Sequence, residues 1–137
     1  MSNAVNEKSF YFAVQIVNLY RFLCDEKKEY ALSKQLIRSG ASIGAIIEES
    51  MLLVQGKRDF LNKVNLALKE ANETYYWIRL LQATGYIDEK TESIASECRE
   101  MIDILTLAVQ TTKVNLEAEK MEKRRRKKEM VNMREAL

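Results

Sequence analysis

The chain has 137 residues, the length of one domain, and it contains no proline and only four glycines, a composition that favours helix over sheet. It contains no histidine, which excludes imidazole base catalysis and histidine metal sites. Its net charge of +2 divides into −2 over residues 1–118 and +4 over residues 119–137. The sequence therefore predicts an all-α domain over residues 1–118, followed by a basic C-terminal tail over residues 119–137 that is either a helical extension or disordered.

No apolar run reaches the roughly 18 to 20 residues that a membrane span needs, and the first residues lack the basic and then apolar order of a secretion signal. We therefore expect a cytoplasmic protein with no membrane partner. The two cysteines, Cys24 and Cys98, fall on apolar helical faces, and we expect both to be small buried hydrophobes, not a disulfide or a metal pair.

Apolar residues recur at steps of three and four in two N-terminal segments. This spacing predicts a first helix over residues 7–24 and a second over residues 31–54, joined by a charged, solvated turn at residues 25–29. The expected inner stripe of the first helix is Phe10, Ala13, Val17, Tyr20 and Cys24, with Ile16 and Leu23 on its flank. The expected inner stripe of the second helix is Leu32, Leu36, Gly40, Ile43, Ile47 and Val54.

The same spacing predicts a third helix over residues 58–84 and a fourth that Asp88 opens as an N-cap. Gly56 is placed to end the second helix and Gly85 to end the third. The expected inner stripe of the third helix is Phe60, Val64, Ala67, Ala71, Tyr75, Ile78 and Leu81. That of the fourth helix is Ile94, Cys98, Met101, Leu105, Ala108, Thr112 and Leu116.

The connections between these four amphipathic segments are only a few residues long. Because so short a connection cannot cross the length of a bundle, consecutive helices must turn back on one another. The sequence therefore predicts an antiparallel up-down-up-down four-helix bundle.

Two glycines in the second helix, Gly40 and Gly44, each lower helix propensity by about 1 kcal/mol relative to alanine. They lie four residues apart on one side of the helix, with Ser39 close to the inner stripe, so a neighbouring helix can approach closely there. We expect this close contact to offset the lost propensity.

A second seam, mixed apolar and acidic, lies beside the inner stripes of the second and third helices. A row that contains a tryptophan is typical of a partner surface, whereas the flank of a bundle helix is also partly buried within a monomer. We predict that this row is an oligomer interface, which comprises Ser42, Ile46, Leu53, Leu66, Glu70, Glu73, Trp77 and Leu80.

Three blocks of the sequence resemble a bacterial family called four-helix bundle protein, also named S23 ribosomal protein or the product of intervening sequences within 23S rRNA genes. The blocks are "EKSFYFAVQIVNLYRFL" at 7–23, "LSKQLIRSGASIGAIIEES" at 32–50 and "KRDFLNKVNLALKEANETYYWIRLLQATGYI" at 57–87. The resemblance covers about residues 7–115, and it implies an antiparallel four-helix bundle that assembles as a homopentamer.

The family is also similar to the accessory variability protein of diversity-generating retroelements, a basic pentameric bundle that binds a reverse transcriptase and nucleic acid. The resemblance thus implies a homo-oligomer, with RNA or DNA and a reverse transcriptase or other protein as candidate partners. The chain departs from the family pattern at Ile46, where an asparagine is usual. We expect the Ile46 side chain to be buried among apolar groups in place of a polar contact. Any role of the asparagine side-chain amide is therefore absent here.

The tail contains the run "KRRRKK" at residues 123–128. Consecutive cations suit phosphate backbones, and the absence of aromatic residues argues against sequence-specific readout by stacking. The alternative is a solvated extension without a partner, and assembly into an oligomer would favour binding because it concentrates the tails. The residues predicted to bind nucleic acid are Lys120, Lys123, Arg124, Arg125, Arg126, Lys127 and Lys128.

No pairing of a nucleophile with a base, no metal ligand set and no phosphate loop is visible, so the sequence predicts a protein that is not an enzyme and has no catalytic residue, metal or cofactor. We expect the acidic residues Glu48, Glu49, Glu70 and Glu73 to form ion pairs with Lys34, Arg38 or Arg79. The predicted function is an oligomeric accessory protein that binds nucleic acid, a nucleic-acid enzyme, or both. The alternative is an oligomeric protein-binding scaffold with no nucleic-acid role.

Overall fold

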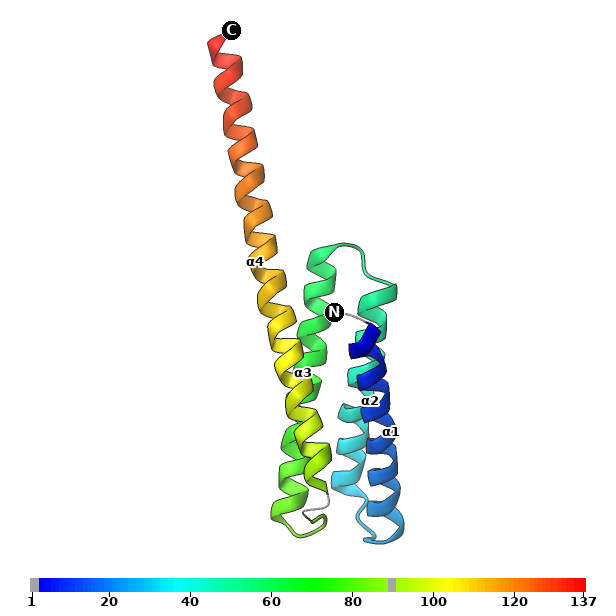
Figure 1. Ribbon diagram of the computed structural model, residues 1–137. Helices are drawn as coiled ribbons and strands as arrows, with labels where there is room; N and C mark the ends of the chain where they lie inside the picture. The colour runs from blue at the N-terminus through cyan, green and yellow to red at the C-terminus, as the bar shows by residue number, and fades with distance from the viewer. Residues whose placement is uncertain (1–2, 89–90) are drawn as a thin grey trace.

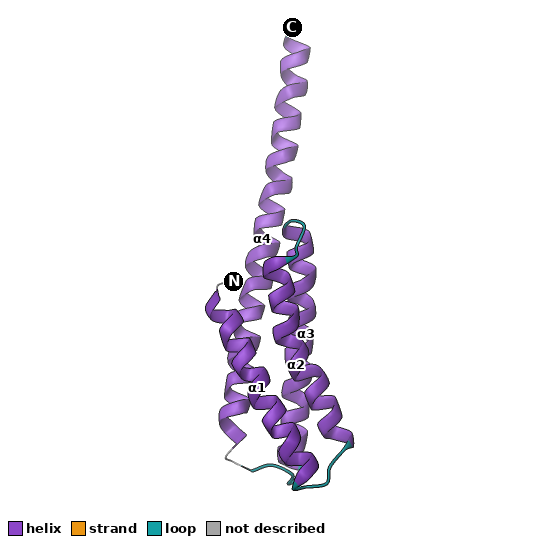
Figure 2. Ribbon diagram, turned by 90° about the vertical axis from the view of Figure 1, so that its right-hand side faces the viewer, coloured by secondary structure: helices purple, strands orange, loops and turns teal. Residues whose placement is uncertain are grey.

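The structure, a computed structural model, describes residues 3–88 and 91–137. These residues form four helices and no strand, which confirms an all-helical fold (Figures 1 and 2). The helices are α1 (Asn3–Asp25), α2 (Ala31–Leu52), α3 (Lys57–Ala83) and α4 (Glu92–Ala136). Consecutive helices lie side by side, and α4 extends well beyond the other three (Figure 1).

The chain changes direction at alternate ends of the bundle. The α1–α2 and α3–α4 connections lie at one end and the α2–α3 connection at the other (Figure 1). The contacts between α2 and α3 agree with this arrangement. Ser39 is hydrogen-bonded to Thr74. Glu49, which lies farther along α2, pairs with Lys63, which lies nearer the start of α3. Each of these connections is only a few residues long.

The predicted inner stripe of α1 is wrong by a rotation of about one residue. The buried side of the helix carries Ser9, Phe12, Ile16, Leu19 and Leu23. Phe10, placed inside by the prediction, is 71% exposed, and the other four members of the predicted stripe are only half-buried. The apolar pattern of α1 covers two adjacent faces, so periodicity alone does not identify the one that faces the core.

The glycines of α2 explain which face of α1 is buried. A Cβ atom on Gly40 would lie 2.9 Å from Cγ2 of Ile16, and one on Gly44 would lie 3.3 Å from the backbone oxygen of Ser9. The backbone of α1 thus lies directly against α2, and a small residue at position 9 allows it. The close approach predicted for the two glycines is confirmed, and it sets the rotation of α1.

The inner stripes of the other three helices are largely as predicted. Their fully buried members include Leu36, Ile43 and Ile47 on α2, Val64, Ala67, Ala71, Ile78 and Leu81 on α3, and Cys98, Met101 and Leu105 on α4. The predicted members that are only half-buried are Leu32, Val54, Phe60, Tyr75, Ile94, Ala108 and Leu116. The stripes omitted Thr74, Ala95 and Val109, which are buried. Ile46 packs against the core, as expected for isoleucine at that position.

The connection between α1 and α2 is not fully solvated, because Glu29 is buried. Its carboxylate accepts hydrogen bonds from the backbone N–H groups of Ala31, Leu32 and Ser33, at 3.1, 2.8 and 2.7 Å. Burial alone would raise the pKa of Glu29, but these backbone hydrogen bonds outweigh it and hold the pKa below its ordinary value. Glu29 therefore caps the start of α2 as a carboxylate.

Two predicted helix boundaries are also corrected. Helix α2 ends at Leu52, and Gly56, with a φ of 96°, is the N-cap residue of α3 instead of the residue that ends α2. The N-cap residue of α4 is Thr91 and not Asp88, and residues 89–90 lie outside the described part of the chain. Gly85 does end α3 as expected, with a φ of 81° and its N–H bonded to the Gln82 oxygen.

Helix α4 runs without a break from the bundle into the tail and ends at Ala136. Among the described residues, the last hydrogen bond or ion pair that joins α4 to the bundle is the one between Lys57 and Glu119. At 1.5 Å per residue, the segment from 120 to 136 projects about 25 Å beyond that contact. We call residues 120–137 the α4 extension (Figure 2).

Candidate protein and nucleic-acid interfaces

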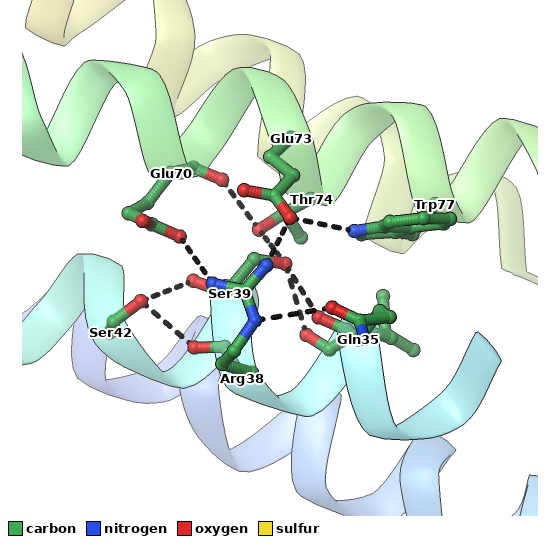
Figure 3. Close-up of polar contacts among 9 residues, drawn as sticks. Gln35, Arg38, Ser39, Ser42, Glu70, Glu73, Thr74 and Trp77 are labelled. Atoms are coloured by element: carbon green, nitrogen blue, oxygen red, sulfur yellow. Dashed lines mark hydrogen bonds and ion pairs between the residues drawn. The ribbon is translucent and has the colours of Figure 1, made fainter. Parts of the chain in front are cut away.

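Arg38 of α2, which was not part of the predicted seam, lies against two acidic residues of the seam on α3, Glu70 and Glu73 (Figure 3). The Arg38 guanidinium pairs with the Glu73 carboxylate and lies 3.6 Å from Oε2 of Glu70. Its Nε donates to the side-chain oxygen of Gln35 at 3.2 Å, and Nε1 of Trp77 donates to the Glu73 carboxylate at the same distance. The predicted ion pairing is confirmed for Glu70 and Glu73, whereas Glu49 pairs with Lys63, which was not among the predicted partners.

One oxygen atom in this seam lacks a hydrogen bond. Oε2 of Glu70 is buried and has no hydrogen-bond partner among the described residues, although Arg38 lies within ion-pair distance of it. The neighbouring hydroxyl of Ser42 is satisfied locally, since it bonds to the Arg38 and Ser39 backbone oxygens at 2.9 Å. The charge of Arg38 therefore compensates this oxygen in place of a hydrogen bond.

The remaining predicted interface residues extend the seam along both helices. Ile46 and Leu80 are half-buried, while Leu66 and Leu53 are 44% and 71% exposed. Leu53 directly follows α2, and Leu80 lies one turn before the end of α3, beside Tyr76 and Arg79. The eight residues therefore form a row along α2 and α3, and their role as an interface stays a prediction.

The structure exposes an apolar surface on α1 that includes Phe10, which was predicted to lie inside. Phe10, Tyr11 and Val14 on the outer side of α1 are 71%, 62% and 42% exposed. The signal was present in the sequence, because α1 has more apolar residues than one inner face can hold. This surface is a second candidate for contacts with a protein partner.

The cations of the α4 extension divide into two sets by their contacts. Arg125 pairs with Glu122 and with Glu129, and Arg126 pairs with Glu122, each within 3.1 Å. Hydrogen bonds from Arg125, which has the larger effect, and from Arg126 hold the pKa of Glu122 below its ordinary value, so the carboxylate stays ionised. These four residues follow the spacing i, i+3, i+4, i+7 and lie on one side of the helix.

The other four cations of the run have no carboxylate within ion-pair distance in the described part of the chain. They are Lys123, Arg124, Lys127 and Lys128, and all of them are exposed. Their spacing of i, i+1, i+4, i+5 places them together on the side of the helix opposite the paired set. We call these four residues the cation face.

Further predicted and unpredicted cations lie near the cation face. Lys120 is within 3.6 Å of Glu117, so its charge is partly balanced. Two further exposed cations, Lys113 before the cation face and Arg134 after it, lie on the same side of α4 by helical phase. Neither was among the predicted residues. Helical spacing alone would have identified them.

The described residues offer little reactive chemistry. They contain no group of three or more cysteine, aspartate or glutamate side chains arranged to hold a metal ion. Cys98 is buried as predicted and burial raises the pKa of its thiol to about 12, whereas Cys24 is only half-buried and its sulfur lies 3.7 Å from Oγ of Ser33. Neither cysteine forms a disulfide.

No described helix combines the length and hydropathy that crossing a bilayer requires.

The chain was compared with known proteins on the basis of sequence and structure. A model of the 23S rRNA-intervening sequence protein family matches residues 1–107. A solved structure from Bacteroides thetaiotaomicron, described as a protein of unknown function from the S23 ribosomal protein family, is 50% identical with a TM-score of 0.76. The similarity covers 79% of this chain and 96% of that chain. No curated protein matches. Sequence and fold together show that the chain belongs to the 23S rRNA-intervening sequence protein family.

Proposed function

We propose that this protein is a non-enzymatic accessory protein that binds nucleic acid through the basic surface of the α4 extension. The observation that supports the proposal is the cation face, four cations that pair with no carboxylate in the part of the chain that the structure describes, on one side of a helix that projects away from the bundle. Cations without internal partners exchange their counterions for phosphates at little cost in lost ion pairs. A projecting helix also leaves room for a long, bulky polymer beside the bundle.

We further propose that the chain forms an antiparallel up-down-up-down bundle that assembles as a homo-oligomer, with a pentamer as the state that the family resemblance implies. Contact pairs such as Gly40 with Ile16 and Gly44 with Ser9, in which one residue number rises as the other falls, support this topology. The seam along α2 and α3 and the exposed apolar residues of α1 support self-association. Assembly would bring several extensions to one ligand, so that weak phosphate contacts act together.

The nucleic-acid role is tested by fluorescence anisotropy with labelled RNA and DNA across a range of salt concentration. We expect the full chain to bind both with an affinity that falls steeply as salt increases, and a chain truncated after residue 118 to lose most of that affinity. Absence of binding by the full chain, or binding that does not depend on salt, contradicts the proposal.

The assembly is tested by light scattering. We expect a Trp77→Ala variant to shift the protein toward smaller species, and a Tyr30→Ala variant to leave the mass unchanged because Tyr30 is an exposed aromatic residue outside the seam. Leu66→Glu is a second seam variant that places a charge at a 44% exposed position and so leaves the core intact. A wild-type chain that is monomeric at micromolar concentration contradicts the assembly.

The alternative function is a scaffold that holds another protein, such as a reverse transcriptase, without contact to nucleic acid. The exposed aromatic residues of α1, Phe10 and Tyr11, favour this alternative. An intact oligomer that binds neither RNA nor DNA at low salt would support the scaffold over the nucleic-acid role.

A further inference from the structure

The charges of the α4 extension are distributed unevenly around the helix. The cation face carries Lys123, Arg124, Lys127 and Lys128, four positive charges with no ion-pair partner among residues 3–88 and 91–137. The opposite side carries Arg125 and Arg126 with Glu122 and Glu129, two positive and two negative charges in contact. A run that looks uniformly basic in the sequence is therefore a helix with one cationic and one neutral side.

Helix α4 also lacks any side chain that stacks on a nucleobase. From Glu92 to Ala136 it contains no phenylalanine, tyrosine or tryptophan. Proteins that hold single strands depend on such residues, on which successive bases stack. The contacts available to the extension are those between cations and phosphates.

The shape of the extension favours a ligand that is itself straight and regular. Together with Lys113 and Arg134, the cation face follows one side of α4 over about 32 Å, at 1.5 Å per residue, and the paired Lys120 and Glu117 lie on the same side. A duplex presents about one phosphate charge per 1.7 Å of its axis, twice the density of a single strand, in positions fixed before binding. A single strand would have to be ordered along the helix without stacking to compensate.

From these observations we infer that the ligand of the α4 extension is the phosphate backbone of a double-stranded nucleic acid, held by the cation face alone. This inference rests on the proposed nucleic-acid role and specifies its ligand. Duplex DNA and duplex RNA share this chemistry. Arg125 and Arg126 contribute to the order of the helix and do not contact the ligand.

Two matched variants of the full chain test which side of the helix binds. Arg124→Gln/Lys127→Gln and Arg125→Gln/Arg126→Gln each remove two positive charges from exposed positions, so a dependence on net charge alone would affect both equally. We expect the first variant to weaken duplex binding about tenfold or more and to lower the slope of log affinity against log salt by about 1.8 per bound extension. We expect the second variant to bind within about twofold of the wild-type chain.

The ligand class is tested with a DNA duplex, an RNA duplex and the separate strands of each, all of equal length and with the same label. We expect each duplex to bind at least about tenfold more tightly than its strands. Preference for one duplex over the other identifies the source of the phosphates and agrees with the inference. Circular dichroism of each variant verifies that α4 remains helical.

The outcomes separate this inference from the proposed function. Equal binding of single strands and duplexes overturns the duplex assignment, and equal losses in the two variants overturn the assignment to one side of the helix. In both cases the nucleic-acid role stands. If the wild-type chain binds no duplex and no strand at low salt, the proposed function fails together with the inference.

Discussion

The bundle and the α4 extension are made of the same kind of secondary structure but are stabilised in different ways. In the bundle, buried apolar side chains and close contacts such as that of Gly40 with Ile16 hold the helices together. In the extension every residue except Glu122 is exposed, and the visible stabilisation is a set of ion pairs within the helix. The bundle therefore depends on tertiary packing, whereas the extension depends on local interactions that contribute only tenths of a kcal/mol each.

The family relationship follows the same division. The family model matches residues 1–107, so it covers α1 to α3 and the first part of α4, and it ends before the α4 extension begins. A match to this family thus accounts for the fold and leaves the extension to be interpreted from its own charges and contacts. Changes to the bundle should affect stability, and changes to the extension should affect ligand binding.

The largest effect on the bundle is expected from Gly40→Leu. A Cβ atom alone would come within 2.9 Å of Ile16, and the rest of a leucine side chain would separate α1 from α2. Overpacking of this kind costs about 3 kcal/mol, which exceeds the roughly 1 kcal/mol of helix propensity that removal of a glycine restores.

Urea unfolding at fixed protein concentration measures this loss. Lys34→Leu is the matched control, because it places the same side chain at an exposed position of the same helix and should change the free energy of unfolding by about 0.5 kcal/mol or less. Equal free energies of unfolding for Gly40→Leu and Lys34→Leu would show that the packing of α1 against α2 does not depend on their close approach at Gly40.

A smaller effect on the bundle is expected from Glu29→Gln. A neutral amide retains part of the cap but loses the charge at the start of α2, and we expect a loss of about 1 kcal/mol near neutral pH. Because the pKa of Glu29 is lowered in the folded state, its contribution is fully present above the ordinary value of 4.5 and is lost as pH falls through the folded pKa.

The difference between wild type and Glu29→Gln in the free energy of unfolding should therefore shrink as the protein is acidified below that range. Unfolding by urea at neutral and at acid pH provides the comparison. A difference that stays constant with pH would mean that the carboxylate is not the group that caps α2.

The smallest effect is expected where the bundle meets the extension. The ion pair of Lys57 with Glu119 joins side chains that are each about half exposed, at 52% and 50%, so its removal by Lys57→Gln should cost about 0.2 to 1 kcal/mol. The loss should disappear in high salt. Thermal unfolding at low and high salt measures it, and a loss of several kcal/mol would indicate that the bundle extends farther along α4 than its contacts suggest.

Some of these features follow from the sequence, and others depend on contacts between distant residues. The inner stripes of α2, α3 and α4 are predictable because each is the most apolar side of its helix. The orientation of α1 is not, since two of its sides are apolar and the choice depends on Gly40 and Gly44. The cap by Glu29 was missed because it lies in a run of charged residues that is typical of a solvated turn.

The candidate surfaces show the same limit. The ion pairs of Arg38 with Glu70 and Glu73 were expected from charge and helical phase, but the buried oxygen of Glu70 appears only once α2 and α3 are placed together. By contrast, the separation of the cation face from Arg125 and Arg126 follows from i, i+3 and i, i+4 spacing. That separation was available in the sequence.

Hydrogen exchange of the backbone amides, measured by mass spectrometry with and without a nucleic-acid duplex, tests the division of the molecule most directly. In the free protein we expect slow exchange in the buried turns of α1 to α4 and fast exchange over residues 120–136, where no tertiary contact protects the helix. Addition of duplex should slow exchange in the extension and leave the bundle unchanged. An extension that is already as protected as the bundle, or one whose exchange the duplex does not alter, would contradict the account.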